Sequence, residues 1–417
     1  MRILHTSDWH LGQYLMTKDR KQEHQRFLNW LIEYLRNQPY DVLIVAGDIF
    51  DSSTPPNYAL KMYFDFLRGV SETACNSVII IGGNHDSVST LHAPRDLLSF
   101  FKVHVVGGIG DDIDDEIIIV NDAGGKPVGI VCAVPFLRDR DIRQSIAGES
   151  YEDRNKAIVE GIADHYRNVK NKALRVESEL KNNGKRVPIV ATGHLFAAGG
   201  AVSDGIREIH VGSLGHVNAS LFPSEFSYIA LGHLHKTQKV SGLDHIRYSG
   251  SPIPLSFSEA GSKKQMISIE FESSVEKPII TDVPIPEFHK IRCVRGDLIT
   301  IENRLKEMGE ANADETIWVE IQVDTDDWIP DVQSRIQEMV EETPIEILAV
   351  KNARHIGTKR LEQKEQQITL HELSPSEVFQ KRLEVEETLS EEDKVKMTRA
   401  FEEIVNRVNT REEEEVK

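Results

Sequence analysis

The first 100 residues alternate short, continuous apolar runs with amphipathic helical patterns. The apolar runs predict strands over residues 2–8, 41–49 and 77–83, and the patterns between them predict helices over residues 20–37 and 58–70. Strands that are apolar throughout and are separated by helices are typical of a sheet buried on both faces. In such a sheet, a ligand site is expected outside the carboxyl ends of the strands.

A second set of apolar runs follows in the next part of the chain. One long polar helix is expected there, over residues 151–183. The runs predict strands within residues 126–136, 187–196, 207–214, 226–240, 245–257 and 264–273. A strand-rich second half indicates a second sheet that faces the first, so residues 1–280 are expected to form one large α/β domain.

The sequence changes character near residue 284. Strand and helix patterns over residues 284–352 predict a small, separate α+β domain. The charged stretch 353–373 is typical of a linker, and two Ser-x-x-acid signals then predict a helix-loop-helix element over residues 374–410. These two helices either dock on a partner or fold back onto the body of the protein, and the pattern leaves both possibilities open.

The composition limits the possible partners. The 417 residues carry a formal net charge of −18, so a phosphodiester substrate would require bound cations or a basic partner to offset this charge. The start of the chain has no signal-peptide layout, and no apolar stretch approaches the ~20 residues needed to cross a bilayer. A cytoplasmic protein without a membrane partner is therefore expected. The 3 cysteines lie far apart, which favours core thiols over disulfides or a thiolate metal site.

Five of the apolar runs end in carboxylate, imidazole or amide side chains. These residues are Asp8, His10, Asp48, Asp51, Asn84, His85, Asp86, His194, His233 and His235. Because alternate residues of a strand point to one face, the two members of the Asp-x-His pair and of the His-x-His pair are each expected to converge. Nitrogen and oxygen donors without thiolates favour Mn²⁺ or Fe²⁺ over a structural zinc ion, and so many donors suit two ions that share a carboxylate.

The ordered blocks Asp-x-His, Gly-Asp-x-x-Asp, Gly-Asn-His-Asp, Gly-His and Gly-His-x-His resemble the calcineurin-like metallophosphoesterase superfamily. More narrowly, "VAGDIFDSSTPP", "GGNHDS" and "SGSPIPLSF" are similar to the SbcD family, the nuclease subunits of bacterial SbcCD complexes. The resemblance extends over nearly the whole chain. It implies two facing mixed sheets flanked by helices, an αββα sandwich, with the small domain capping the nuclease site. It also implies a homodimer within a two-plus-two heterotetramer, in which the C-terminal helices dock on the SbcC ATPase.

The resemblance further implies a role for each site residue. Seven residues would hold two divalent ions, most favourably Mn²⁺: Asp8, His10 and His235 on one ion, Asn84, His194 and His233 on the other, and Asp48 on both. His85 would lie beside the ions and stabilise the transition state or protonate the leaving oxygen. Asp51 would pair with His85 and raise the pKa of its imidazole. Asp86 is expected to form the turn or to orient a ligand.

The stretch "GDIFDSSTPP" bears on the substrate. Monoester phosphatases of this superfamily carry an arginine soon after the second acid, and this stretch has none. A diester carries less charge, so we expect a DNA nuclease for repair and recombination that acts as an exonuclease on duplex ends and as an endonuclease on hairpins. One alternative is a small phosphodiesterase of the cyclic-nucleotide type, which would not need the small domain or the helical tail. The other is a non-catalytic scaffold for DNA ends, which the intact ligand set argues against.

Overall fold

The computed structural model describes residues 1–143, 150–180, 186–197, 218–272, 277–311, 315–324 and 332–353. The strand expected within 207–214, the linker beyond residue 353 and the helices expected over 374–410 lie outside the described residues. Residues 1–354 form one compact unit. Among the described helices, none is long and apolar enough to cross a membrane.

The first sheet has six strands in the order β14-β13-β1-β4-β5-β6. Their bounds are β1 Arg2–Thr6, β4 Val42–Ala46, β5 Val78–Ile81, β6 Val103–Val106, β13 Gln265–Glu270 and β14 Ile279–Pro284. Strands β1, β4, β5 and β6 are parallel, whereas β13 is antiparallel to both of its neighbours. Helices α1 (Lys21–Asn37) and α2 (Asn57–Ser71) connect the first three parallel strands. The strands and helices predicted for the first 100 residues are therefore confirmed.

The second sheet also has six strands, in the order β11-β12-β10-β9-β8-β7. Their bounds are β7 Ile117–Asn121, β8 Pro127–Cys132, β9 Ile189–His194, β10 Tyr228–Gly232, β11 Gln238–Val240 and β12 Leu243–Tyr248. The four strands from β8 to β12 in this order are parallel, and the two edge strands are antiparallel to them. The long helix predicted over 151–183 is α6, Tyr151–Leu180.

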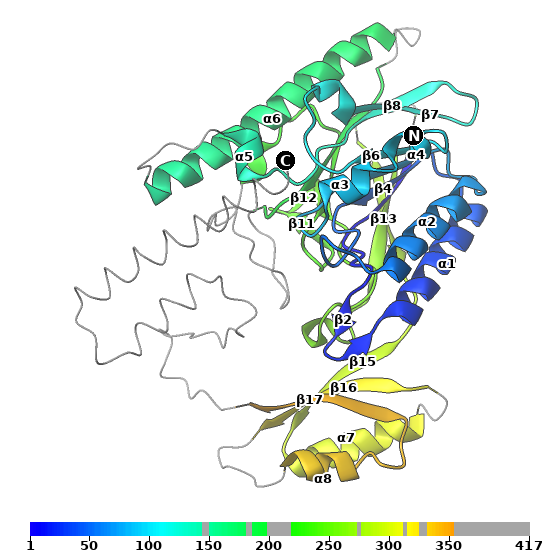
Figure 1. Ribbon diagram of the computed structural model, residues 1–417, viewed down its shortest axis with the longest axis vertical. Helices are drawn as coiled ribbons and strands as arrows, with labels where there is room; N and C mark the ends of the chain where they lie inside the picture. The colour runs from blue at the N-terminus through cyan, green and yellow to red at the C-terminus, as the bar shows by residue number, and fades with distance from the viewer. Residues whose placement is uncertain are drawn as a thin grey trace. The chain divides into compact units, whose positions relative to one another are not determined.

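Three apolar cores hold four layers together, with α1 and α2 on one side and α6 on the other (Figure 1). Adjacent residues of one strand divide between two cores: Ile44 of β4 lies between the sheets, and Val45 lies under α1 and α2. This division explains why the strands are apolar at every position. On the far side, Tyr166 of α6 packs against the second sheet. The expected αββα sandwich is confirmed.

The small domain has its own core and its own sheet. Strands β15 (Lys290–Gly296), β16 (Ile317–Asp324) and β17 (Ile345–Ala353) are parallel and are connected through α7 (Leu298–Ala311) and α8 (Val332–Glu338). Short helices α3 (Val88–His92), α4 (Arg95–Ser99) and α5 (Asp139–Ile142) and a hairpin of β2 (Tyr14–Leu15) and β3 (Lys18–Asp19) complete the helices and strands relevant here.

His5 makes the stability of the sandwich depend on pH. It is fully buried on β1, and its Nδ1 lies 3.0 Å from the hydroxyl of Tyr228 on β10, in the opposite sheet. Burial lowers the pKa of His5 to about 3, whereas the unfolded chain binds a proton below pH 6.5. The free energy of unfolding should therefore fall as the pH drops, by roughly 2 kcal/mol for this residue between pH 7.5 and pH 5.

Urea unfolding at the two pH values, in EDTA, tests this prediction. The His5→Asn protein should lose less stability on acidification than the parent, by about that amount. His24, whose pKa is also lowered to about 3 by burial, should maintain part of the pH dependence in both proteins. An equal pH dependence of parent and variant would contradict the prediction.

Candidate metal centre

The carboxyl ends of five strands from both sheets meet at one site. Asp8 and His10 follow β1, Asp48 follows β4, Asn84 follows β5, His194 ends β9, and His233 and His235 follow β10. Hydrogen bonds between main-chain groups tie the first two loops together: the amide of Asp8 donates to the oxygen of Gly47 at 3.0 Å, and that of His10 donates to the oxygen of Asp48 at 3.0 Å. The site expected from the strand ends is thus assembled by the two sheets together.

The loops reach the site through a backbone conformation that side chains rarely adopt. Among the described residues, seven that are not glycine have positive φ, and four of these are predicted ligands: Asp8 at 53°, His10 at 47°, Asp48 at 50° and His233 at 100°. Such a conformation costs on the order of 1–3 kcal/mol per residue and clusters at functional sites. Asp8 and His10 therefore lie in a loop beyond β1, and strand alternation is not the reason that they converge.

Glycines allow the loops to approach one another. A Cβ atom on Gly83 would lie 2.1 Å from Oδ1 of Asp48, and one on Gly232 would lie 1.9 Å from the main-chain oxygen of Ala46. Both distances are far shorter than van der Waals contact. The glycines of the "GGNHD" and "LGHLH" blocks are needed because any side chain there would separate the loops that carry the donors.

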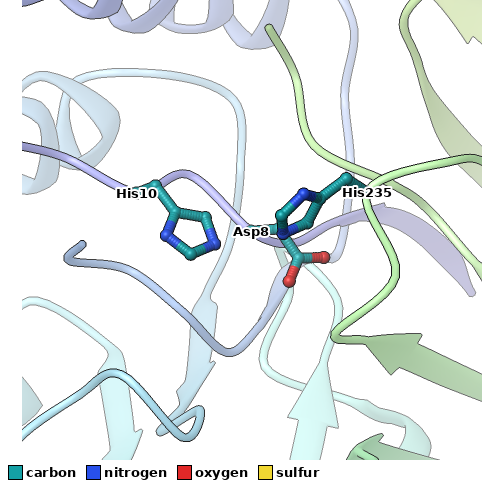
Figure 2. Close-up of side chains that lie close together, drawn as sticks. All are labelled: Asp8, His10 and His235. Atoms are coloured by element: carbon teal, nitrogen blue, oxygen red, sulfur yellow. The ribbon is translucent and has the colours of Figure 1, made fainter. Parts of the chain in front are cut away.

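The first group of donors, called the Asp8 group, consists of Asp8, His10 and His235. One ligand atom from each lies within 4.8 Å of the others, and all three residues are buried. Figure 2 shows the imidazole of His235 beside the carboxylate of Asp8, with His10 next to them. The main-chain amide of His233 donates to Oδ1 of Asp8 at 2.9 Å, which fixes the carboxylate. Nε2 of His10 is buried and has no hydrogen-bond partner among the described residues, so it is available to a ligand.

The second group, called the Asp48 group, consists of Asp48, His194 and His233. Asn84 joins it, because its Oδ1 lies 2.9 Å from Nε2 of His194 and 3.1 Å from Nδ1 of His233. The structure therefore separates His233 from His235, and the expectation from strand spacing that this pair converges on one locus is wrong. The loop after β10 has left the extended conformation that the spacing argument requires.

The protonation of His194 is set by its other ring nitrogen. Nδ1 of His194 donates to the main-chain oxygen of Ala46 at 2.9 Å, so in the neutral ring Nε2 carries a lone pair. That lone pair faces Oδ1 of Asn84 and, at 3.2 Å, Oδ2 of Asp48. Three acceptors directed at one point repel each other unless a positive charge lies among them.

The histidine pKa values show the same demand for positive charge. Burial alone would lower the pKa of His194, but the carboxylate of Asp48 raises it to about 9. Burial would also lower the pKa of His10, whereas its hydrogen bond to Asp51 and the charges of Asp48 and Asp51 raise it to about 9. A buried set of nitrogen and oxygen donors that favours added positive charge fits divalent ions such as Mn²⁺.

His85 lies at the rim of the site. It is half-buried; its main-chain amide donates to Oδ1 of Asp48 at 2.9 Å, and its Nδ1 lies 2.8 Å from the main-chain oxygen of Asp51. One ligand atom each of His10, Asp51 and His85 lies within 4.8 Å of the others, and Nδ1 of His10 lies 3.1 Å from the carboxylate of Asp51. Asp51 thus lies close to both rings, and its pairing with His85 stays a prediction. Because Nδ1 of His85 donates to a main-chain oxygen, its Nε2 can donate a proton only from the imidazolium form.

Two acids outside the ligand set shape the site. Asp86 is buried, and its carboxylate accepts from the main-chain amides of Ile49, Phe50 and Gly83 at 2.8–3.1 Å, as expected for a turn-forming acid. Glu259 lies 3.4 Å from Nδ1 of His235 and was not predicted. The sequence around it, "SFSEAG", carries no metal-binding or capping signal, so its position depends on the path of the chain.

Two facing sheets with paired donor groups at their carboxyl ends define a metallophosphoesterase. Residues 1–237 match the family model described as calcineurin-like phosphoesterase. Residues 287–387 match the model described as type 5 capsule protein repressor C-terminal domain. Together the two matches span the sandwich and the small domain.

Similar curated proteins share one name, which makes each of them the SbcD component of the nuclease SbcCD. The protein from Escherichia coli strain K12 is 38% identical over 387 residues, which cover 93% of this chain and 94% of that protein. The Rhodobacter capsulatus protein is 36% identical over 268 residues (63% and 64% of the two chains), and the Bacillus subtilis protein is 30% identical over 278 residues (66% and 68%). The chain belongs to the SbcD family of calcineurin-like phosphoesterases.

Proposed function

We propose that the chain is a metal-dependent nuclease that hydrolyses phosphodiester bonds of DNA at two divalent ions, together with the ATPase SbcC. One observation carries the two-ion assignment. Oδ2 of Asp48 lies between the two donor groups, 3.6 Å from Nε2 of His10 and 3.2 Å from Nε2 of His194. A carboxylate in this position is suited to bridge two ions.

The donor groups support one assignment of ligands. The Asp8 group would hold one ion, Asn84, His194 and His233 would hold the other, and Asp48 would contact both. When bound, two such ions lower the pKa of a water molecule and stabilise the charge on the phosphate oxygens. Mn²⁺ suits the mixture of imidazole, carboxylate and amide donors.

His85 and Asp51 would act on the leaving side of the reaction. The hydrogen bond between Nδ1 of His85 and the main chain of Asp51 fixes the ring, so that its Nε2 is the nitrogen left to face a substrate. In the imidazolium form, Nε2 would donate a proton to the leaving oxygen. The carboxylate of Asp51 would hold His10 in the orientation that a ligand requires.

DNA is favoured over a small ester because the chain has a second domain beyond the sandwich. We propose that residues 284–352 cap the site, that the linker 353–373 and the helices 374–410 connect the body to SbcC, and that the enzyme acts on duplex ends and hairpins. The relatives' names place them in SbcCD complexes. Bound cations would offset the net charge of −18 at the substrate. Chromosomal DNA as the substrate puts the place of action in the cytoplasm.

An exposed apolar patch supports a homodimer. On α4 and the turn after it, Leu97, Phe100 and Phe101 are 64%, 84% and 52% exposed. Contiguous apolar side chains of this size are rare on monomers. We expect a second copy of the chain to cover the patch, and Leu97→Asp to convert the dimer to a monomer in light scattering after size exclusion. Ile299→Asp, at a 71% exposed site on α7, is the control and should remain dimeric; dimeric Leu97→Asp protein would contradict the interface.

Cleavage of an end-labelled linear duplex and of a hairpin, with Mn²⁺, Mg²⁺ or EDTA, tests the function. A chromogenic phosphodiester and a phosphomonoester are assayed alongside, and SbcC with ATP is added in a second series. Mn²⁺-dependent shortening of the duplex and nicking of the hairpin are the expected results. Hydrolysis of the small diester without any attack on DNA, even with SbcC and ATP, would overturn the proposal in favour of a small-molecule phosphodiesterase. Binding of DNA without hydrolysis of any ester would indicate a scaffold.

A further inference from the structure

A buried ion pair lies directly behind the Asp8 group. Glu259, at the end of the short helix Phe257–Glu259, is 5% exposed, and Lys264, just before β13, is 9% exposed. The two side chains form a salt bridge. Burying two charges costs free energy that an ion pair only partly returns, so a fold that keeps such a pair gains something else from it.

The pair holds His235 at both its main chain and its ring. Nζ of Lys264 donates to the main-chain oxygen of His235 at 3.1 Å and to Oγ of Ser251 at 2.8 Å. The carboxylate of Glu259 lies with Oε1 3.4 Å from Nδ1 of His235, and its other oxygen accepts from Lys264 and, at 3.4 Å, from Ser251. The amide of Ser251 also donates to the oxygen of His235, at 3.1 Å. His235 is thus anchored on the side away from Asp8.

We propose that Glu259 is a positioning residue that fixes the ring orientation and the tautomer of His235, with Lys264 holding the carboxylate in place. This inference rests on the proposed two-ion function. A proton kept on Nδ1 by the carboxylate leaves the lone pair on Nε2, the nitrogen that remains to join Asp8 and His10. Carboxylates behind metal-binding histidines act in this way, and their loss typically weakens metal binding by about 10–100-fold.

A second buried pair provides a matched control. Glu116 is buried and lies 2.8 Å from Nε2 of His165 on α6, so it repeats the carboxylate–imidazole arrangement of Glu259 and His235. Neither member of this pair has a recorded contact with a predicted ligand in the described part of the chain. A structural role for a buried carboxylate should therefore affect both pairs alike, whereas a positioning role should affect only Glu259.

The experiment measures Mn²⁺ binding by titration calorimetry and the bound stoichiometry by elemental analysis, with thermal unfolding recorded in EDTA. The variants are Glu259→Ala, Glu259→Gln, the double variant Glu259→Gln/Lys264→Met, which leaves no unpaired charge, and Glu116→Gln. We expect Glu259→Ala to weaken one of two Mn²⁺ sites by about 10–100-fold and to leave the other unchanged. The Gln variants, whose amide oxygen can still accept from Nδ1, should retain part of the affinity. Glu116→Gln should change only the unfolding temperature.

The outcomes separate the two proposals. Two Mn²⁺ sites of parental affinity in every Glu259 variant, or equal weakening of both sites in proportion to lost stability, would overturn the positioning role and leave the two-ion function intact. A parent protein that binds fewer than two Mn²⁺ ions would overturn the proposed function, and the positioning role with it. If Glu259→Ala does not fold, the two Gln-containing variants decide the result.

Discussion

Asp48→Asn is expected to abolish ion binding and phosphodiester cleavage together. The substitution retains the size of the side chain but removes its charge and one of its two acceptor oxygens. In the parent, Oδ2 of Asp48 lies between the two donor groups and Oδ1 accepts from the amide of His85. Because stabilisation by bound ions contributes several kcal/mol to the transition state, the rate should fall by about 10³-fold or more.

The measurement pairs the cleavage rate of an end-labelled duplex with the number of Mn²⁺ ions bound per chain. Asp65→Asn, on the exposed face of α2, changes charge in the same way and should keep both values. Unfolding in EDTA shows whether the Asp48 variant remains folded. A variant that retains both ions at parental affinity, whatever its rate, would refute a bridging role for Asp48.

Much of this site is predictable because it depends on local sequence. Continuous apolar strands and helical periodicity predicted the first sheet with its helices, and the parallel arrangement brought the ends of β1, β4 and β5 together. The spacing of Asp8 and His10 predicted their proximity, although a left-handed loop and not a strand produces it. The same argument failed for His233 and His235, which lie in different donor groups because the loop after β10 turns between them.

The parts that could not be predicted depend on contacts between distant segments. Glu259 reaches His235 only because the loop that follows β12 returns to the site before β13 begins, and no local pattern encodes that path. Likewise, "GNHD" places His85 next to a ligand, but only the folded chain shows that its ring contacts the main chain of Asp51. Hydrophobic patterns determine which residues are buried, whereas the partner of each buried polar group depends on tertiary structure.

His85→Ala should reduce turnover of DNA by about 10²–10⁴-fold while both ions stay bound, because a general acid contributes a factor of this size. His85 contributes its main-chain amide to Asp48, which alanine retains, and its ring lies outside both donor groups. The loss should therefore appear in kcat, with Mn²⁺ affinity unchanged. His245→Ala, on β12, is the control and should retain the parental rate.

The leaving group distinguishes proton donation from other roles of His85. The alkoxide that leaves a DNA strand needs a proton, whereas a nitrophenolate is stable without one, so His85→Ala should lose far less activity on a nitrophenyl diester than on DNA. Parental activity on DNA should also fall at high pH as the imidazolium form of His85 is lost, and that limb of the profile should be absent from the variant. Equal losses on both substrates with an unchanged pH profile would mean that His85 stabilises charge on the phosphate and that the leaving oxygen takes its proton from water.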